Sequence, residues 1–244
     1  MLKKIINFIR NNPKELDRQY LADIYIKGEG IEIGALHLPL LVKNKDAVVK
    51  YVDRMGEKEL RSQYPELNDK PLVPVDYIAD GELLETIKDN SQDFVIANHF
   101  IEHCQNTILT IKNMLRVVKP GGIIFLAVPD KRYTFDKSRA VTTLSHLIED
   151  YETGPAHGKE QHFYEWAKIF NAEKDEKSII AYTKNLIAID YSIHFHVWAK
   201  KDMDELLVYL MTILKFDFEI ALSLRPDGSN ENVYILRKVL DEMI

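Results

Sequence analysis

The feature that most constrains the fold is an uninterrupted apolar run in the middle of the chain, from Ile123 to Pro129. A strand that is apolar on both faces is typical of a parallel sheet covered by helices on both sides. A second strand is predicted from Phe94 to His99, and the periodic segment 108–118 between the two predicts a helix that Lys119-Pro120-Gly121-Gly122 ends. This strand, helix, strand order predicts an α/β fold with a doubly wound, parallel sheet.

Two strands predicted upstream end in residues that suit a ligand site. The first, residues 30–34, carries Glu32 and ends at Gly34, where a backbone turning toward a helix can approach a ligand closely. The second, residues 47–54, carries Asp53 about 20 positions after the glycine turn. In nucleotide-binding α/β units a carboxylate at this spacing accepts the two ribose hydroxyls. Together these strand ends predict a nucleotide-type cofactor site.

The remaining pattern completes the sheet around one long interruption. Residues 73–81 predict a weaker third strand, and a helix at 202–214 precedes two strands, 216–224 and 232–238, that pair as an antiparallel hairpin. The interruption is polar and rich in aromatic residues, and it predicts helices at 142–152, 159–171 and 173–188. Two amphipathic helices, 3–11 and 14–25, are predicted before the first strand.

Composition narrows the classes of partner. The chain has 244 residues, and 32 basic against 38 acidic side chains give a net charge of −6, which argues against nucleic acid or an anionic membrane. No apolar run approaches the roughly 20 residues that span a bilayer, and no signal peptide is recognised. The single cysteine, Cys104, excludes an internal disulfide and fits a reducing compartment. We expect a cytoplasmic protein with a small-molecule or glycan substrate and leave its oligomeric state open.

Over residues 28–129 and 201–240 the chain resembles the class I S-adenosylmethionine-dependent methyltransferases, of the type 11 kind. The matching segments are Ile31-Glu32-Ile33-Gly34-Ala35, Tyr51-Val52-Asp53, Ala79-Asp80-Gly81, Asp93 to His103, and Leu115 to Gly122. The resemblance implies a Rossmann-like sheet of seven strands, mostly parallel with an antiparallel last strand, and S-adenosylmethionine as cofactor. It divides the chain into N-terminal helices (1–28), a cofactor-binding core (29–129), a mainly helical substrate-cap insertion (130–200) and the C-terminal part of the core (201–244).

The resemblance also implies cofactor contacts at the strand ends, by Glu32, Gly34, Ala35, Asp53, Asp80, Gly81, Asn98 and His99. Glu32 and Gly34 would border the methionine portion, and Asp53 would bind the ribose. The chain departs from the family at Leu36, Leu38 and Pro39, which stand where further glycines are usual. The same missing glycines argue against a dinucleotide dehydrogenase.

Histidines supply the candidates for a general base, because a neutral imidazole accepts a proton near pH 7. The candidates are His99, His146, His194 and His196. The alternation of residues 194–198 predicts a strand with both of its histidines on one face, turned toward the methyl group.

A metal is possible but not assigned. The sequence His99-x-x-Glu102-His103 matches the inverted zinc-peptidase pattern, but a histidine at the end of a strand is out of helical register with the second one. A divalent ion bound near these residues, and a role of Glu102 and His103 in capping the next helix, both stay open.

The insertion supplies the candidates for substrate binding: Asp130, Arg132, Tyr133, Asp136, Arg139 and Asp150. The first of these leave the carboxyl end of a central strand, where open α/β sheets bind ligands. His146 and Asp150 form an i,i+4 pair, which fits either a solvated salt bridge or, beside Tyr151, His157 and His162, a polar pocket. Such a pocket suits a hydroxyl-rich substrate such as a sugar.

We therefore expect an O-methyltransferase that acts on a small polar or carbohydrate-type molecule, as in polysaccharide biosynthesis. The first alternative is a non-catalytic binding module on the same fold, which the leucines in the glycine turn suggest. The second is a zinc hydrolase that uses His99, Glu102 and His103.

Overall fold

The computed structural model describes residues 16–171 and 174–240. The predicted helix at 3–11 and the first residues of the one at 14–25 lie outside this part, and the second helix is seen as α2, Arg18–Tyr25. The predicted start of a helix at residue 173 also lies outside it. No helix in the described part combines the length and the apolar character needed to cross a membrane.

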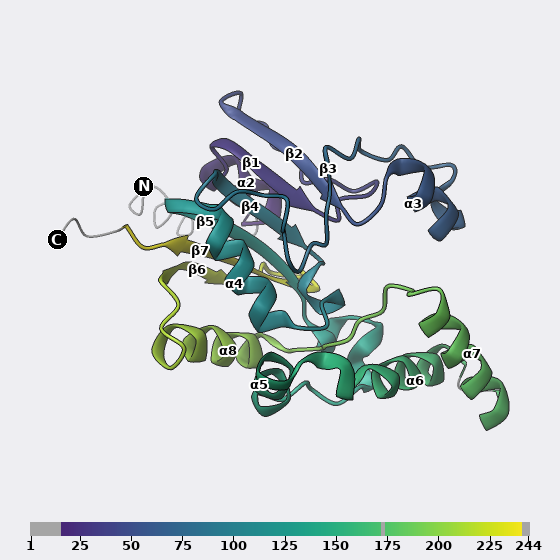
Figure 1. The fold of residues 1–244 in the computed structure, drawn as a ribbon. Coiled ribbons are helices and arrows are strands. Elements are labelled where there is room, and N and C mark those ends of the chain that lie inside the picture. The colour runs from purple at the N-terminus through teal and green to yellow at the C-terminus, as the bar shows by residue number, and fades with distance from the viewer. Residues whose placement is uncertain (1–15, 172–173, 241–244) are drawn as a thin grey trace.

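The sheet has seven strands in the order β3-β2-β1-β4-β5-β7-β6 (Figure 1). Their bounds are β1 Gly28–Ile33, β2 Ala47–Asp53, β3 Tyr77–Ile78, β4 Gln92–Asn98, β5 Val118–Pro129, β6 Phe218–Leu224 and β7 Glu231–Lys238. Only β7 runs against its neighbours, since it pairs antiparallel with both β5 and β6. The predicted fold, a mostly parallel Rossmann-like sheet with an antiparallel last strand, is confirmed.

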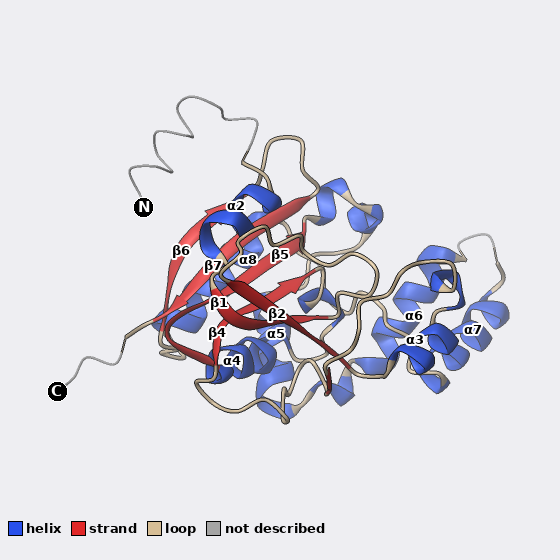
Figure 2. Cartoon of the chain, turned by 90° about the horizontal axis from the view of Figure 1, so that it is seen from above, coloured by secondary structure: helices blue, strands red, loops and turns tan. Residues whose placement is uncertain are grey.

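Alternating side chains of the central strands pack into two separate cores. In β5, Ile124 and Leu126 join the core formed with α4 (Thr107–Val117), α5 (Leu144–Thr153) and α8 (Lys200–Thr212). Ile123 and Phe125 join the core that α2 covers. Figure 2 shows α2 and α4 on opposite sides of the strands. Both faces of β5 are therefore buried, which explains its uninterrupted apolar sequence.

The insertion lies below the sheet in the view of Figure 1, with α5, α6 and α7 in a row. Its remaining helices are α6, Lys159–Phe170, and α7, Glu176–Ala188, and they pack into a third core with Phe163, Phe195 and Trp166. The shorter elements are α3 (Glu57–Gln63) and the 3₁₀ turns at Pro65–Leu67, Ile101–His103, Lys131–Tyr133, Phe135–Ser138 and Pro155–His157.

Several elements differ from the sequence prediction. The segment 34–46 after β1, expected to turn into a helix, has no helix. Pro39 disfavours helical backbone in the residue before it and has no N–H to donate. The third strand is shortened to two residues, and residues 194–198 form no strand, because only Trp198 makes a bridge, to Asp130. Strand β5 begins at Val118 rather than at residue 123, and a register shift opposite Gln92 and Phe94 accommodates the extra residues.

A buried carboxylate holds the extended segment that replaces the expected helix. Both oxygens of Glu32 accept the Leu40 N–H, at 2.9 and 3.2 Å, and the Glu32 side chain is 1% exposed. Burial raises the pKa of Glu32 to about 7, although the Leu40 N–H and Arg18 act in the opposite direction. The ordinary value in an unfolded chain is about 4.5.

This raised pKa gives a testable pH dependence of stability. The folded state holds a proton on Glu32 that the unfolded chain has lost, so its contribution is present below about pH 4.5 and is lost as the pH rises through about 7. Glutamine does not titrate, so the Glu32→Gln variant does not lose stability at this position as the pH rises. Urea unfolding should show the free energy of unfolding of the variant, relative to wild type, rising by up to about 3 kcal/mol over that range.

Glu29→Gln, on the exposed end of the same strand, is the matched control and should follow wild type at each pH. A difference between Glu32→Gln and wild type that is the same at every pH would contradict the assignment.

Candidate functional site

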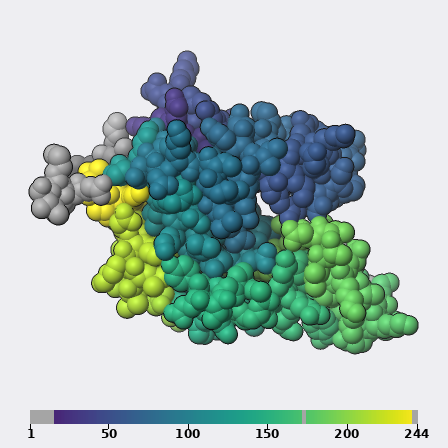
Figure 3. Space-filling model, in the orientation of Figure 1, coloured from purple at the N-terminus to yellow at the C-terminus, as the bar shows by residue number. Residues whose placement is uncertain are grey.

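A cavity of about 410 Å³ opens at the carboxyl ends of the first four strands. Gly34 after β1, Asp53 at the end of β2, Asp80 after β3 and His99 after β4 all line it. Ligands of open α/β sheets bind at this edge of the sheet. Figure 3 shows the surface hollowed between the blue segment that contains α3 and the green insertion.

A second hollow, of about 500 Å³, lies at the opposite ends of these strands. It is lined by Gly28 and Asp93, at or near the starts of β1 and β4, and by Lys119 and Arg237. Open α/β sheets bind ligands at the carboxyl ends of their strands rather than at the amino ends. In addition, the carboxylate of Asp93 already forms an ion pair with Lys119, at 2.7 Å. We therefore place the functional site at the carboxyl ends.

Five of the eight predicted cofactor residues line the cavity: Gly34, Asp53, Asp80, Gly81 and His99. The other three, Glu32, Ala35 and Asn98, are not among its lining residues. The carboxylate of Glu32 is turned to Leu40, as described above. Contacts between the cofactor and each of the eight stay predictions.

Two glycines that line the cavity, Gly34 and Gly81, stand where a larger residue would be strained or would clash. Gly34 has a φ of +65°, and a Cβ on Gly81 would lie 2.5 Å from a ring carbon of Phe100 and 2.7 Å from Ile33. Because Phe100 is itself a cavity wall, a larger residue at position 81 would displace that wall. The requirement at Gly81 is therefore close packing rather than backbone conformation.

The leucines of the glycine turn leave the cavity open. Leu36 lines it, with the left-handed φ of +50° that a non-glycine residue adopts at some cost. Leu38 is 72% exposed and lies outside the lining. The departure from the usual glycines thus shapes the cavity without filling it.

The carboxylate of Asp53 is half-buried and faces the cavity. Its Oδ1 accepts the Arg54 N–H at 2.7 Å. Burial raises the pKa of Asp53 to about 6, against the lowering effect of the Arg54 backbone and guanidinium. A hydroxyl-bearing ligand would find an ionised acceptor there above that pH.

His99 is held between two carboxylates at the end of β4. Its Nε2–H donates to Glu231 at 2.8 Å, and its Nδ1 lies 3.7 Å from Glu102. Arg18 pairs with Glu231 from the other side, at 3.2 Å. Burial lowers the pKa of His99, but the hydrogen bond to Glu231 and the charges of Glu102 and Glu231 outweigh it, so the net pKa is raised. This is the arrangement of a base whose other nitrogen is oriented by a carboxylate.

The residues of the zinc-peptidase pattern are not arranged as in a peptidase. His99 has a φ of +48° after its strand, and His103 closes a three-residue 3₁₀ turn, so no helix presents them together. Glu102, His103 and His194 do place one ligand atom each within 4.8 Å of one another. The carboxylate oxygens of Glu102 are buried and have no hydrogen-bond partner among the described residues. This group could hold a cation.

Glu102 and His103 do not cap the following helix. Asn106 is the cap of α4, and the carboxylate of Glu82 accepts the N–H groups of Gln105 and Asn106. His103 does bond to loop backbone, since its Nδ1–H donates to the Ile193 carbonyl at 2.9 Å. The predicted capping role is therefore wrong.

The insertion forms the far wall of the cavity through Asp190, Tyr191, Ser192 and Phe195. Arg54 ties this wall to the core, because its guanidinium bonds to the Asp190 carboxylate at 2.9 Å and to the Asp190 carbonyl at 3.0 Å. We call these contacts the Arg54 latch.

The other predicted bases do not line the cavity. His194 is turned to Asp136, with 2.7 Å between Nδ1 and a carboxylate oxygen, and His196 packs against His146. Between them in the sequence, Phe195 reaches the cavity. The expectation that 194–198 turns both histidines to one shared face is wrong, because the segment is not a strand. A catalytic role for His146, His194 or His196 stays a prediction.

None of the six predicted substrate residues lines the cavity either. Asp136 is 1% exposed and pairs with Arg139 at 3.0 Å, and Asp130 is fully buried and pairs with Arg132 at 2.6 Å. Hydrogen bonds and charges from His194 and Arg139 lower the pKa of Asp136 in spite of its burial. Tyr133 is half-exposed, and Asp150 belongs to a histidine cluster. Their binding of substrate stays a prediction.

Several lining residues were not predicted as site residues from the sequence: His37, Arg54, Tyr64, Glu66, Leu67, Glu82, Phe100, Cys104, Gln105, Asp190, Tyr191, Ser192 and Phe195. Most sit in loops, and no periodicity or spacing marks a loop residue as facing a cavity. Arg54 had one available signal, since it directly follows the predicted ribose carboxylate.

Comparison with known proteins supports the reading of the core. Residues 34–126 match the family model described as a methyltransferase domain. No curated protein matches the chain.

Solved structures resemble the chain at low sequence identity. A protein described as a Zn-dependent alcohol dehydrogenase from Rhodobacter sphaeroides is 16% identical, with a TM-score of 0.51 and coverage of 90% of this chain and 87% of that one. An S-adenosylmethionine-dependent methyltransferase from Aquifex aeolicus is 11% identical (TM-score 0.49, coverage 93% and 90%). Another from Methanosarcina mazei is 18% identical (TM-score 0.46, coverage 93% and 99%). At these identities the comparison concerns the fold alone.

The Arg54 latch predicts how the insertion wall is held. Arg54→Met should speed backbone amide exchange at residues 189–192, because it removes the hydrogen bonds that join them to the core. Global stability should fall by no more than about 1 kcal/mol, since the ion pair is partly solvent-exposed. Exchange measured by mass spectrometry on the whole chain checks this.

Lys159→Met is the matched control. Lys159 reaches the same Asp190 carboxylate, at 3.5 Å, but from within the insertion. Equal exchange rates in the two variants would show that the latch does not hold the wall.

Proposed function

We propose that the chain, whose residues 34–126 match the methyltransferase-domain family model, is an S-adenosylmethionine-dependent enzyme that methylates a hydroxyl oxygen of a small polar or carbohydrate-type acceptor. The observation that carries the proposal is the cavity lined by Asp53, Asp80 and His99 at the strand ends. Two carboxylates suit a ribose and an adenine, and an oriented histidine suits removal of a hydroxyl proton. The family match favours this enzyme over a non-catalytic binding module.

The cavity residues divide the work between binding and proton transfer. When bound, S-adenosylmethionine supplies the electrophilic methyl group. Asp53 would accept hydrogen bonds from the ribose, and Asp80 with the Gly81 backbone would hold the adenine. His99 receives the acceptor's proton on Nδ1 while its Nε2–H stays bonded to Glu231. Alignment of the acceptor oxygen with the methyl group supplies the rest of the rate enhancement.

The insertion side of the cavity supports a polar acceptor. Tyr64, Tyr191 and Phe195 present aromatic rings there, and Ser192 and Asp190 present polar groups. Aromatic faces beside hydroxyl and carboxylate groups fit a ring that carries hydroxyls, whereas a purely apolar acceptor would leave the polar groups unpaired. The buried, unpaired Cys104 fits the cytoplasmic location that is part of this proposal.

Cofactor binding gives the first test. Calorimetric titration with S-adenosylhomocysteine should show saturable binding, and Asp53→Ala should weaken it by about 1.5–3 kcal/mol for each charged hydrogen bond lost, or roughly 10- to 150-fold in Kd. Wild-type affinity should also fall as the pH drops below about 6, because Asp53 then takes up a proton.

Asp46→Ala, just before the opposite end of β2, is the control and should bind like wild type. If wild-type protein shows no binding even at millimolar S-adenosylhomocysteine, the proposal is wrong.

The base gives the second test. His99→Asn should lower kcat by about 10²- to 10⁴-fold. Activity needs neutral His99, so it is lost as the pH falls through the His99 pKa. Glu231→Gln removes a charge that raises this pKa, so the acidic limb of the pH–rate profile should move to lower pH.

An unmoved acidic limb in Glu231→Gln would exclude His99 as the titrating base. Methyl transfer from labelled S-adenosylmethionine to a panel of sugars, polyols and amines tests the acceptor class. Label found on amines alone would exclude hydroxyl methylation.

A further inference from the structure

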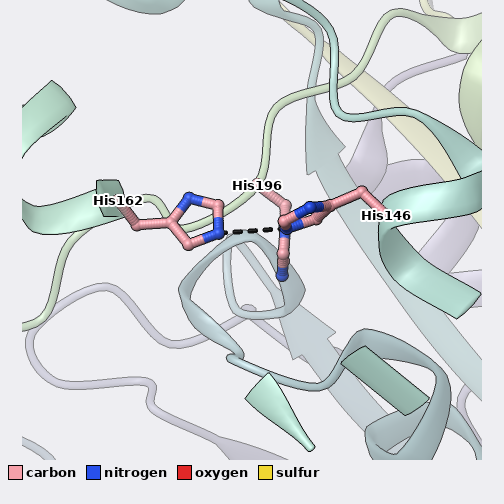
Figure 4. A group of neighbouring side chains, drawn as sticks. All are labelled: His146, His162 and His196. Atoms are coloured by element: carbon pink, nitrogen blue, oxygen red, sulfur yellow. Dashed lines mark hydrogen bonds between the residues drawn. The ribbon is translucent and has the colours of Figure 1, made fainter. Parts of the chain in front are cut away.

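A cluster of histidines lies in the insertion, outside the cavity lining (Figure 4). His146 comes from α5, His162 from α6, and His196 from the segment before α8. One ring nitrogen from each lies within 4.8 Å of the others, and the Nε2 atoms of His146 and His162 are 3.1 Å apart. Three elements distant in sequence therefore direct imidazoles to one point.

Asp150 places a carboxylate beside two of these histidines, His146 and His196; the Nε2 of His196 also lies 3.4 Å from the Gln105 carbonyl oxygen. The Oδ2 atom of Asp150 lies 3.3 Å from Nε2 of His146 and 3.7 Å from Nε2 of His196. The residue is 1% exposed, and this oxygen has no hydrogen-bond partner among the described residues. The other oxygen of Asp150, Oδ1, lies 3.6 Å from Nε2 of His157, a histidine outside the cluster. A buried carboxylate oxygen without a donor is costly unless a cation satisfies it.

The imidazoles themselves are suited to hold a cation as neutral ligands. His196 is fully buried, and its Nδ1 has no hydrogen-bond partner among the described residues. The Nδ1 atom of His162 is also buried without a partner in the described part of the chain. Neutral imidazole nitrogens and an ionised carboxylate are ligands of divalent transition metals.

We propose that His146, His162, His196 and Asp150 bind one Zn²⁺ ion. Three imidazole nitrogens and one carboxylate oxygen make a complete tetrahedral set. Two nitrogens at ~2.0–2.1 Å from a tetrahedral zinc are ~3.3 Å apart, close to the spacing of His146 and His162. His157, against the second oxygen of Asp150, occupies the place of an outer partner that orients a ligand.

Four protein ligands leave no open position, so the ion is structural. It joins α5, α6 and the segment that contains Phe195, a wall of the ligand cavity. The His162 and Phe195 rings are 5.8 Å apart, and the His196 N–H donates to the Glu102 carbonyl at 3.2 Å. The ion would thus hold in place the part of the insertion that faces the ligand cavity, without contacting the cofactor.

Cobalt titration of the chelator-treated full chain tests the proposal. Wild type should take up one equivalent of Co²⁺ with the strong visible absorption of a tetrahedral site, and Zn²⁺ should displace it. His162→Ala and Asp150→Asn should each weaken binding by more than the roughly 10- to 100-fold that a change to an outer partner costs. His162 is partly exposed and Asp150→Asn keeps the side-chain shape, so loss of folding is not expected to mask the result.

His103→Asn is the matched control, because His103 belongs to the separate group with Glu102 and His194. It should bind cobalt like wild type. No uptake by wild type, unchanged uptake in both His162→Ala and Asp150→Asn, or loss of uptake only in His103→Asn would each overturn the proposal. These outcomes do not depend on methyl transfer, so they leave the proposed function to its own tests.

Discussion

The carboxylate of Glu32 is the interaction on which the ligand cavity depends. It holds the Leu40 N–H from inside the sheet and so sets the course of residues 34–46. This segment has no helix, so no row of helix N-terminal N–H groups faces the ligand. In the proposed function, recognition would therefore rest on Gly34, which lets the backbone approach, and on the carboxylates of Asp53 and Asp80, which line the cavity at the neighbouring strand ends.

The polar residues of the insertion serve its internal structure first. Asp136, Arg139 and His194 form one buried set, in which Arg139 also donates to the His194 carbonyl at 2.8 Å. Buried charges are tolerated when they are paired and hydrogen-bonded. What reaches the cavity is mostly aromatic or comes from the loop at 190–192. The core thus lines the cavity with Asp53, Asp80 and His99, and the insertion lines it with Phe195 and the loop at 190–192.

Sequence analysis could predict the parts that depend on local pattern. The apolar runs marked β4 and β5, and the carboxylate spacing marked Asp53, since parallel strands bring their carboxyl ends to one edge. Residues 194–198 show the limit, because their alternation resembles a strand but no neighbouring strand is available to pair with them. The convergence of His146, His162 and His196 is likewise invisible in sequence, since it depends on how α5 packs on α6.

The position of β7 links the order of synthesis to chemistry. This strand leaves the ribosome after the other six, yet it lies between β5 and β6 in the sheet. Until it inserts, β5 has an open edge and His99 lacks Glu231, the first residue of β7. A nascent or C-terminally clipped chain could therefore assemble β1 to β4 while its imidazole is still unoriented. If His99 is the base proposed above, it gains its orienting carboxylate only when β7 closes the sheet.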